Sequence, residues 1–373
     1  MVYHLQHEML PQQTGDEIAR AHYVLSLKRF LMRNVRPANV PAYENEGKDL
    51  FIAKHGRAPQ SRAEVAEAMM LTPHFQMWSS LNRSSQQLMW RTVGESIYRD
   101  LDRMEAASER LINAADKKGS LDLDPTFDAH AQYPMHHIHL QPEGYLAEDD
   151  GKSVTSGAFY EAGGRIYSMG RGMEAGDSKA GAVIAFLRQL RPDFKPTRIL
   201  DMGCSAGGAS TSYPEAFPDA EVHAIDLGSS MLRYAHARAE SMGAPVHFHQ
   251  MDAGKTRFPD GHFDLIVSHN MLHEISDAKR QEMARETLRL LAPGGIALHQ
   301  DVDILNRGRT VAEEAERGWD LNYNNEPYWE MYADCDLRSE LIAAGFPEDM
   351  AQERRIPKTD GPGFWYAWTA EKA

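Results

Sequence analysis

The sequence has few of the features that mark secreted or membrane proteins. Only two cysteines, Cys204 and Cys335, occur among 373 residues, so a disulfide framework is excluded and a reducing compartment is expected. The first residues lack a basic stretch followed by an apolar one, so no signal peptide is expected. No apolar run reaches the ~18 residues that a membrane-spanning helix needs. These absences predict a cytoplasmic protein with no membrane partner.

An excess of positive charge is also missing. The chain carries 40 basic and 54 acidic residues, a formal net charge of −14. Nucleic acids and anionic membranes bind basic surfaces, so neither is expected as a partner. The acidity is uneven, because residues 1–130 carry a net −1 and residues 131–373 a net −13. This split indicates two unlike parts.

Residues 1–130 are predicted to form a helical domain. Apolar residues recur at a spacing of three to four over residues 16–33 and again over residues 74–115, as in amphipathic helices. Ser61, followed by Glu64 three positions later, predicts a helix start with a capping box. We expect this domain to act as a lid, to contribute to an acceptor site, or to form a homodimer through its helices.

Residues 131–176 are predicted to be an irregular connector that contributes to the active site. Three closely spaced histidines, His136, His137 and His139, lie within it. Imidazoles bind zinc or iron, but no cysteine lies nearby and the spacing matches no common zinc pattern. We therefore expect no metal site, and we expect the connector to line a pocket.

Residues 177–373 alternate predicted helices with predicted strands. The expected strands are 197–203, 221–227, 245–251, 263–268, 294–303 and 364–370. Such alternation predicts an α/β fold with a parallel, doubly wound sheet.

The most informative segment is the glycine-rich stretch RILDMGCSAGG at residues 198–208. An apolar strand ends in Asp201, and Gly203, Ser205 and Gly207 follow before a helix. Such a turn lets backbone N–H groups approach a ligand closely. The next strand ends in Asp226, placed to accept hydrogen bonds from ribose hydroxyls. Asp252 follows the third strand, placed to meet an adenine amino group.

These residues resemble the motifs of the class I S-adenosylmethionine-dependent methyltransferases. The resemblance covers residues 160–373 and rests on Asp201-x-Gly203-x-Ser205-x-Gly207 with Asp226, on Met251-Asp252-Ala253, on FPDGHFDLIVSHNMLHEI and on Leu288–Gly295. It implies a Rossmann-like methyltransferase sheet behind an N-terminal all-α domain, with S-adenosyl-L-methionine as cofactor. A dinucleotide-binding dehydrogenase is the competing interpretation. It is disfavoured because Ser205 and Ala206 occupy the middle of the turn.

The resemblance also implies which residues bind the cofactor. The turn would bind the methionine end of the cofactor, and Asp226 would bind its ribose. Leu227 would lie against the adenine plane. Asp252 and Ala253 would contact the adenine edge. Upstream, an arginine would pair with the cofactor carboxylate or form a surface salt bridge. The full set is Tyr160, Arg171, Asp201, Gly203, Ser205, Gly207, Asp226, Leu227, Asp252, Ala253 and His269.

Candidates for acid–base chemistry follow the fourth and fifth core strands. The resemblance places the loop carrying His269 and His273 beside the donor methyl group. His299 and Asp301 end the next strand, where such sheets face their ligands. A base is needed only where the acceptor must lose a proton. Alternatively, His273 caps or packs the helix that follows.

The acceptor site is expected at an aromatic segment near the C-terminal end. We expect acceptor contacts from His273, Trp319, Tyr323, Tyr328 and Trp329, with ordinary packing as the alternative. The predicted reaction is methyl transfer by in-line displacement to a small apolar or aromatic molecule. O-methylation is favoured because several His and Asp residues could take a hydroxyl proton, and C-methylation follows closely. The alternatives are a peptide or protein methyltransferase and a non-catalytic cofactor-binding protein.

Overall fold

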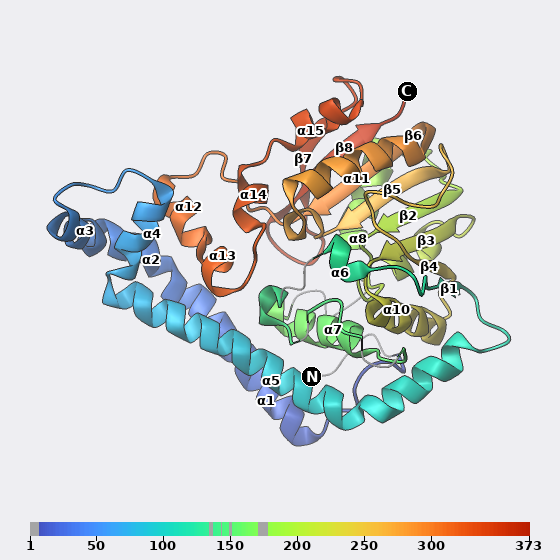
Figure 1. Ribbon diagram of the computed structural model, residues 1–373, viewed down its shortest axis with the longest axis horizontal. Helices are drawn as coiled ribbons and strands as arrows, with labels where there is room; N and C mark the ends of the chain where they lie inside the picture. Colours follow the sequence, from blue (N-terminus) through green and yellow to red (C-terminus); the bar gives the residue numbers. More distant parts are fainter. Residues whose placement is uncertain (1–6, 134–136, 143, 149–150, 171–177) are drawn as a thin grey trace.

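The computed structural model describes residues 7–133, 137–142, 144–148, 151–170 and 178–373 (Figure 1). A long helical layer lies along one side of the molecule, and a twisted sheet covered by helices lies on the other. Among the described residues, no helix combines the length and apolar character needed to span a membrane.

Eight strands form one sheet in the order β1-β4-β3-β2-β5-β6-β8-β7. Their bounds are β1 Ser120–Asp122, β2 Arg198–Met202, β3 Glu221–Asp226, β4 Val246–Gln250, β5 Phe263–His269, β6 Leu291–Asp301, β7 Gln352–Pro357 and β8 Phe364–Glu371. The strands from β1 to β6 pair in parallel, while β8 runs antiparallel to β6 and β7. The predicted doubly wound sheet is confirmed, except that β8 runs opposite to the other strands and makes the sheet mixed.

Helices cover both faces of this sheet. On one face, α8 (Ser178–Leu190) and α10 (Ser229–Met242) pack against strand residues such as Ile199. On the other, α11 (Asp277–Leu290) and α15 (Leu337–Ala344) pack against residues such as Leu200. Successive strand side chains point to opposite faces, so one apolar strand supplies both cores. The strand order reverses between β2 and β5, and the carboxyl ends of strands at such a point bind ligands.

The N-terminal helices are α1 Gly15–Phe30, α2 Asn39–Ala42, α3 Lys48–His55, α4 Arg62–Met70 and the long α5 Pro73–Ile112. Both predicted amphipathic helices are present as α1 and α5. Only half of the predicted capping box forms at α4. The Ser61 hydroxyl accepts a bond from the Glu64 N–H, whereas the Glu64 carboxylate accepts from the Gln60 N–H.

Two elements differ from the predicted domain boundaries. Strand β1 lies inside the predicted helical domain, yet it pairs with β4 at the sheet edge. The predicted connector contains a regular helix, α7 (Thr155–Tyr167), which packs against α5 and α10 (Figure 1). The rest of the connector includes the short helix α6 (Ala129–Gln132) and a 3-10 turn, Ile138–Leu140.

A segment between β6 and α15 joins the sheet to the N-terminal helices. It contains α12 (Val311–Arg317), α13 (Trp319–Tyr323) and α14 (Trp329–Asp334), and Figure 1 shows α12 beside α4. The Arg36 guanidinium donates to both carboxylate oxygens of Glu316, at 2.7 and 2.8 Å. The Trp319 indole N–H donates to the Ser79 hydroxyl at 2.8 Å. These contacts tie the two parts of the chain together.

Candidate active site

A cavity of about 420 Å³ lies at the carboxyl ends of β2 and β5. One part of its wall is the turn after β2, and the adjoining part is the loop after β5, with Trp329. Helix α7 and connector residues close it from the side of the N-terminal helices, where Trp90 of α5 also reaches it. This is the place that the reversal of strand order predicts for a ligand.

The glycine-rich turn has the backbone that close ligand approach requires. Gly203 and Gly207 have φ angles of +71° and +72°, and Ser205 has +49°. A Cβ on Gly203 would lie 2.6 Å from the Met271 sulfur, so a larger residue would not fit. Asp201 lies one residue before the end of β2, is buried, and accepts a hydrogen bond from the Ser210 hydroxyl at 2.7 Å. Asp201, Gly203 and Ser205 line the cavity, whereas the Cα of Gly207 packs on Ala235 and Phe248.

Asp226 braces this turn from the end of β3. Its carboxylate accepts hydrogen bonds from the backbone N–H groups of Ser205 at 2.9 Å and Gly228 at 3.0 Å. Burial raises the pKa of Asp226, while these donors oppose that rise. Leu227 follows directly, and its carbonyl accepts from the Gln250 amide at 2.9 Å. Contacts to ribose and adenine stay predictions.

The adenine-side residues are held within the fold. Asp252 accepts from the Gly254 N–H at 2.8 Å and pairs with the Lys279 ammonium at 2.7 Å. Ala253 is buried in the core beside α11. Their predicted contact with adenine is untested, and for Asp252 the ion pair with Lys279 competes with it.

Of the two upstream candidates, Tyr160 lines the cavity and Arg171 lies outside the described residues. Arg165, from the same segment, lines the cavity and pairs with Glu161 at 3.1 Å. The predicted pairing of an arginine with the cofactor carboxylate therefore stays a prediction.

His269 and His273 both line the cavity, as predicted. The His269 ring lies 2.9 Å from the Tyr213 hydroxyl and 3.0 Å from the Gln300 amide oxygen, so both nitrogens have partners. His273 Nδ1 lies 2.6 Å from Asp301 Oδ1, which leaves Nε2 for the cavity. The other oxygen of Asp301 accepts from the backbone N–H groups of Leu272 and His273. Asp301 thus orients His273 and shapes its loop.

His299 does not take the predicted position. It is fully buried, and its ring contacts the Ser268 and Thr287 hydroxyls at 3.0 and 3.3 Å. Burial lowers the pKa of His299 to about 3. The residue packs against Trp368 on the covered face of the sheet and does not line the cavity. This geometry corrects its assignment as an acid–base residue.

Only one of the four predicted acceptor-binding aromatics lines this cavity, namely Trp329. It meets the His273 ring edge-on, with centroids 5.8 Å apart. Trp319 packs instead on Trp78 of α5 and on Tyr323, and Tyr328 lies against Tyr133. For these three, the alternative of ordinary packing describes the structure.

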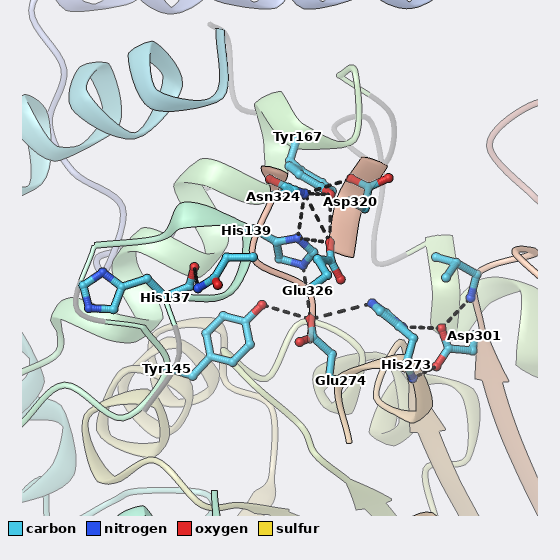
Figure 2. Close-up of polar contacts among 12 residues, drawn as sticks. His137, His139, Tyr145, Tyr167, His273, Glu274, Asp301, Asp320, Asn324 and Glu326 are labelled. Carbon is cyan, nitrogen blue, oxygen red and sulfur yellow. Dashed lines mark hydrogen bonds and ion pairs between the residues drawn. The ribbon is translucent and has the colours of Figure 1, made fainter. Parts of the chain in front are cut away.

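The fold assembles a polar cluster that the sequence analysis missed (Figure 2). It consists of His139 from the connector, His273 and Glu274 from the loop after β5, and Glu326 from the loop between α13 and α14. Each contributes one potential metal-ligand atom, and these atoms lie within 4.8 Å of one another. We expected no metal site because the three histidines of the connector match no common zinc pattern. That expectation concerned residues close together in the sequence, whereas the residues of this cluster meet only in the fold.

Within this polar cluster, carboxylates surround the two imidazoles. His139 Nδ1 lies 2.5 Å from Glu326 Oε1, and His139 Nε2 lies 3.1 Å from Glu274 Oε1. Burial alone would lower the pKa of each histidine, but the carboxylates reverse this effect. They raise the pKa of His139 well above its usual range and that of His273 to about 9. Asp320 lies close to Glu326. Its burial and the Glu326 carboxylate raise the pKa of Asp320 to about 7.

The N-terminal helices fix the position of His139. His139 and Leu140 have φ angles of +55° and +59°, which cost of order 1–3 kcal/mol each outside glycine. The His139 carbonyl accepts hydrogen bonds from the Gln86 amide at 2.9 Å and the Trp90 indole at 2.6 Å. Both donors belong to α5, so the helical layer holds a strained segment against the cavity.

The neighbouring histidines of the connector do not share this role. Figure 2 shows the His137 ring turned away from the cluster, and the residue is exposed. His136 lies outside the described residues. His139, Glu274 and Glu326 all stand in segments that the sequence had singled out, Glu326 in the aromatic segment between Trp319 and Trp329. The sequence carried no signal for the two glutamates themselves.

Comparison with known proteins agrees with this geometry. Residues 199–295 match a family described as a methyltransferase domain. Phosphoethanolamine N-methyltransferase 3 of Arabidopsis thaliana is 31% identical over 168 residues, covering 43% of this chain and 31% of the plant protein. Demethylmenaquinone methyltransferase of Thermus thermophilus is 36% identical over 100 residues, or 27% and 44% of the two chains.

A solved structure of phosphoethanolamine N-methyltransferase 2 from Haemonchus contortus gives a TM-score of 0.43 at 17% identity, covering 60% of this chain and 58% of that one. The match spans about a third of the length of the plant relatives. Residues 199–295 therefore form a methyltransferase domain. The motifs and the sheet order resemble those of the class I S-adenosylmethionine-dependent methyltransferases, whose cofactor is S-adenosylmethionine.

Proposed function

We propose that the chain transfers a methyl group from S-adenosylmethionine to an oxygen of a small aromatic or apolar molecule bound in this cavity. The observation that carries the proposal is that the glycine-rich turn and the pair His273–Glu274 line the same cavity. Transfer to carbon is the second candidate. The cavity has aromatic walls from Trp90, Tyr145, Tyr160 and Trp329, which suits a flat acceptor.

The residues present fit the cofactor. The φ angle of Gly203 and the bracing of Ser205 by Asp226 shape a turn whose backbone lies open to the cavity. When bound, S-adenosylmethionine supplies a methyl group already activated by the positive sulfur. The protein then has to align donor and acceptor and exclude water.

His273 is the residue we propose for proton transfer. Asp301 fixes its Nδ1, so its Nε2 is available to an acceptor hydroxyl. Glu274 stands beside it, with Oε1 at 3.7 Å from that nitrogen. The helical layer contributes indirectly, through the placement of His139 beside Glu274.

The relatives support a small acceptor, since their names specify phosphoethanolamine and demethylmenaquinone. A panel of phenols, enols, amines and short peptides, incubated with methyl-labelled S-adenosylmethionine, tests the proposal. We expect label in a small O–H compound and a loss of at least ~100-fold for His273→Gln, the range of general-base effects. Label found only in peptides would favour the protein methyltransferase, and binding of the donor without any turnover would favour the non-catalytic alternative.

We further propose that the N-terminal helices form a homodimer surface and that the protein is cytoplasmic. The exposed apolar side chains that support dimerisation are Tyr23, Phe30, Leu50, Ile52, Met77, Leu81 and Tyr98. Sedimentation of the full chain tests this. A monomer at all concentrations would exclude the dimer.

A further inference from the structure

We propose that His139, His273 and Glu274 bind a divalent transition-metal ion at the wall of the cavity. What the ion would do in the cavity rests on the proposed function. The binding itself follows from the geometry of these three side chains and of the two carboxylates behind them.

The two imidazoles are oriented as metal-binding histidines are. A ligating histidine commonly donates its second ring N–H to a carboxylate, which fixes the tautomer and turns the other nitrogen toward the metal. His273 Nδ1 lies 2.6 Å from Asp301, and His139 Nδ1 lies 2.5 Å from Glu326. Each ring therefore has one nitrogen held by a carboxylate, and its Nε2 remains for a ligand.

Both free nitrogens point toward the same oxygen. Glu274 Oε1 lies 3.1 Å from His139 Nε2 and 3.7 Å from His273 Nε2. Ligand bonds of ~2.0–2.2 Å around one ion place neighbouring donor atoms roughly 3.0–3.6 Å apart. Figure 2 shows the His139 ring above the Glu274 carboxylate and the His273 ring to its right. The potential ligand atoms of the cluster all lie within 4.8 Å of one another, as a shared ion requires.

A second observation is that carboxylate oxygens at the cluster have no partner. Glu274 Oε2 and Glu326 Oε2 are buried and accept no hydrogen bond from any described residue. The Glu326 side chain is only 1% exposed. A buried carboxylate oxygen without a donor is costly, and an ion is one of the few ways to satisfy it.

Formal charge also favours a cation. Glu274, Glu326 and Asp301 converge on two imidazoles, with Asp320 behind Asn324. The raised pKa values of His139 and His273 keep both rings protonated near neutral pH, and a metal ion would take the place of these protons. With the imidazoles neutral, as metal ligands must be, the three nearest carboxylates bring three negative charges into a largely buried volume. A divalent ion would offset most of this charge.

The donor set narrows the choice of metal. Two imidazoles and one carboxylate suit iron(II), manganese, cobalt or zinc, and this set leaves coordination positions open. Calcium and magnesium prefer oxygen ligands alone, so they fit poorly. His273 and Glu274 line the cavity, so the open positions would face an acceptor.

The ion would select acceptors with an oxygen donor, such as phenols, enols or 2-oxo acids, and would lower the pKa of a ligating hydroxyl. The balance of the transfer is then simple. With the ion bound, His273 Nε2 is a metal ligand and no longer the proton acceptor proposed above, so the acceptor O–H bond breaks and its proton passes to water. The acceptor oxygen, or the carbon of an enolate, forms a bond to the methyl group. The methyl–sulfur bond breaks, and its electron pair remains on sulfur as S-adenosylhomocysteine.

Metal binding by the full chain tests the proposal without any methyl transfer. Chelator-treated protein is titrated with cobalt(II) and, under nitrogen, with iron(II), followed by calorimetry and by the visible absorption of cobalt. We expect one ion per chain in the wild type. His139→Ala and His273→Ala should each weaken binding by at least 100-fold, and Asp301→Asn by 10- to 100-fold, as outer partners of metal ligands do.

His137→Ala is the matched control, because it removes an imidazole two positions from His139 whose ring is turned away. It should bind cobalt as the wild type does. Glu274→Gln has nearly the same shape as the wild type. It therefore tests the metal site even if an alanine variant fails to fold. Calorimetry with S-adenosylhomocysteine on each variant shows whether the donor site remains intact.

The proposal is overturned if the wild type binds no ion tighter than millimolar, or if the variants of His139, His273 and Glu274 bind as well as the wild type. Loss of S-adenosylhomocysteine binding by the wild type would instead contradict the proposed function. The two failures are therefore distinguishable.

Discussion

The side-chain amide of Gln86 donates a hydrogen bond to the backbone carbonyl of His139 at 2.9 Å, and its oxygen accepts one from Lys28 at 2.6 Å. This single side chain therefore links α1, α5 and the connector. It joins a buried cation to a residue of the active-site cluster.

Gln86→Met should show how much this link stabilises the fold. The variant keeps the volume but leaves Lys28 without its acceptor and His139 with Trp90 as its remaining donor. We expect a loss of about 1–3 kcal/mol in the free energy of unfolding, the usual cost of unsatisfied buried groups. Urea denaturation measures it. An unchanged midpoint would show that the link is weak.

Lys28 should make stability depend on pH in the alkaline range. Burial lowers the pKa of Lys28 from 10.5 to about 8, while Asp320 opposes this effect. Between pH 8 and 10.5 the folded protein has lost a proton that the unfolded chain keeps. Rising pH therefore favours the folded wild type over this window, and at pH 7 the buried charge is a cost.

A Lys28→Met variant lacks this group, so its stability relative to wild type should fall by about 1–2 kcal/mol between pH 7.5 and 9.5. Unfolding of both proteins at the two pH values gives the difference. A constant difference would mean that Lys28 titrates normally in the folded state.

Two adjacent glycines of α7 should respond in opposite ways to alanine. A Cβ on Gly163 would lie 2.1 Å from the Trp90 ring, whereas a Cβ on Gly164 meets nothing within 4 Å. We expect Gly163→Ala to destabilise by about 1–3 kcal/mol through overpacking. Gly164→Ala should stabilise by about 0.5–1 kcal/mol through helix propensity. Thermal unfolding without ligands compares them, and equal effects would contradict the close packing of α7 on α5.

Asp226 should be needed for cofactor affinity. Asp226→Ala removes the acceptor for the Ser205 and Gly228 N–H groups, so the turn loses its brace. We expect at least tenfold weaker binding of S-adenosylhomocysteine by calorimetry, or about 1.4 kcal/mol or more.

Asp264 is the matched control for that experiment. Its carboxylate also accepts hydrogen bonds from two backbone N–H groups, those of Thr197 and Arg198. These two residues lie at the start of β2, at the opposite end of the strand from the turn. Asp264→Ala should lower stability and leave affinity unchanged. Equal losses of affinity in both variants would point to general destabilisation.

The parts of the fold that the sequence predicted are those encoded locally. The turn from Asp201 to Gly207 and the apolar core strands each have their signal within a few residues. The sequence did not predict strand β7, because it is an edge strand of largely polar residues in which only Ile356 is buried. Strand β1 has three residues, too few for a periodic pattern.

The roles of the residues that were misassigned or missed depend on partners far away in the sequence. Trp319 has the same local signal whether it faces an acceptor or a helix, and its partner Ser79 lies 240 residues earlier. His139 and Glu274 are 135 residues apart, and their contact requires the whole chain to fold. A single sequence holds no signal for such pairs.

The packing of α7 between α5 and α10 has a consequence during synthesis. Apolar residues of α5, such as Trp90 and Ile97, share one core with Phe159 of α7 and Tyr234 of α10. At ~5–20 residues per second, a ribosome needs roughly 7–30 s to make the chain from α5 to the end of α10. During that time only α1 can cover part of the apolar face of α5. We therefore expect the nascent chain to need chaperones, and residues 1–112 expressed alone to aggregate.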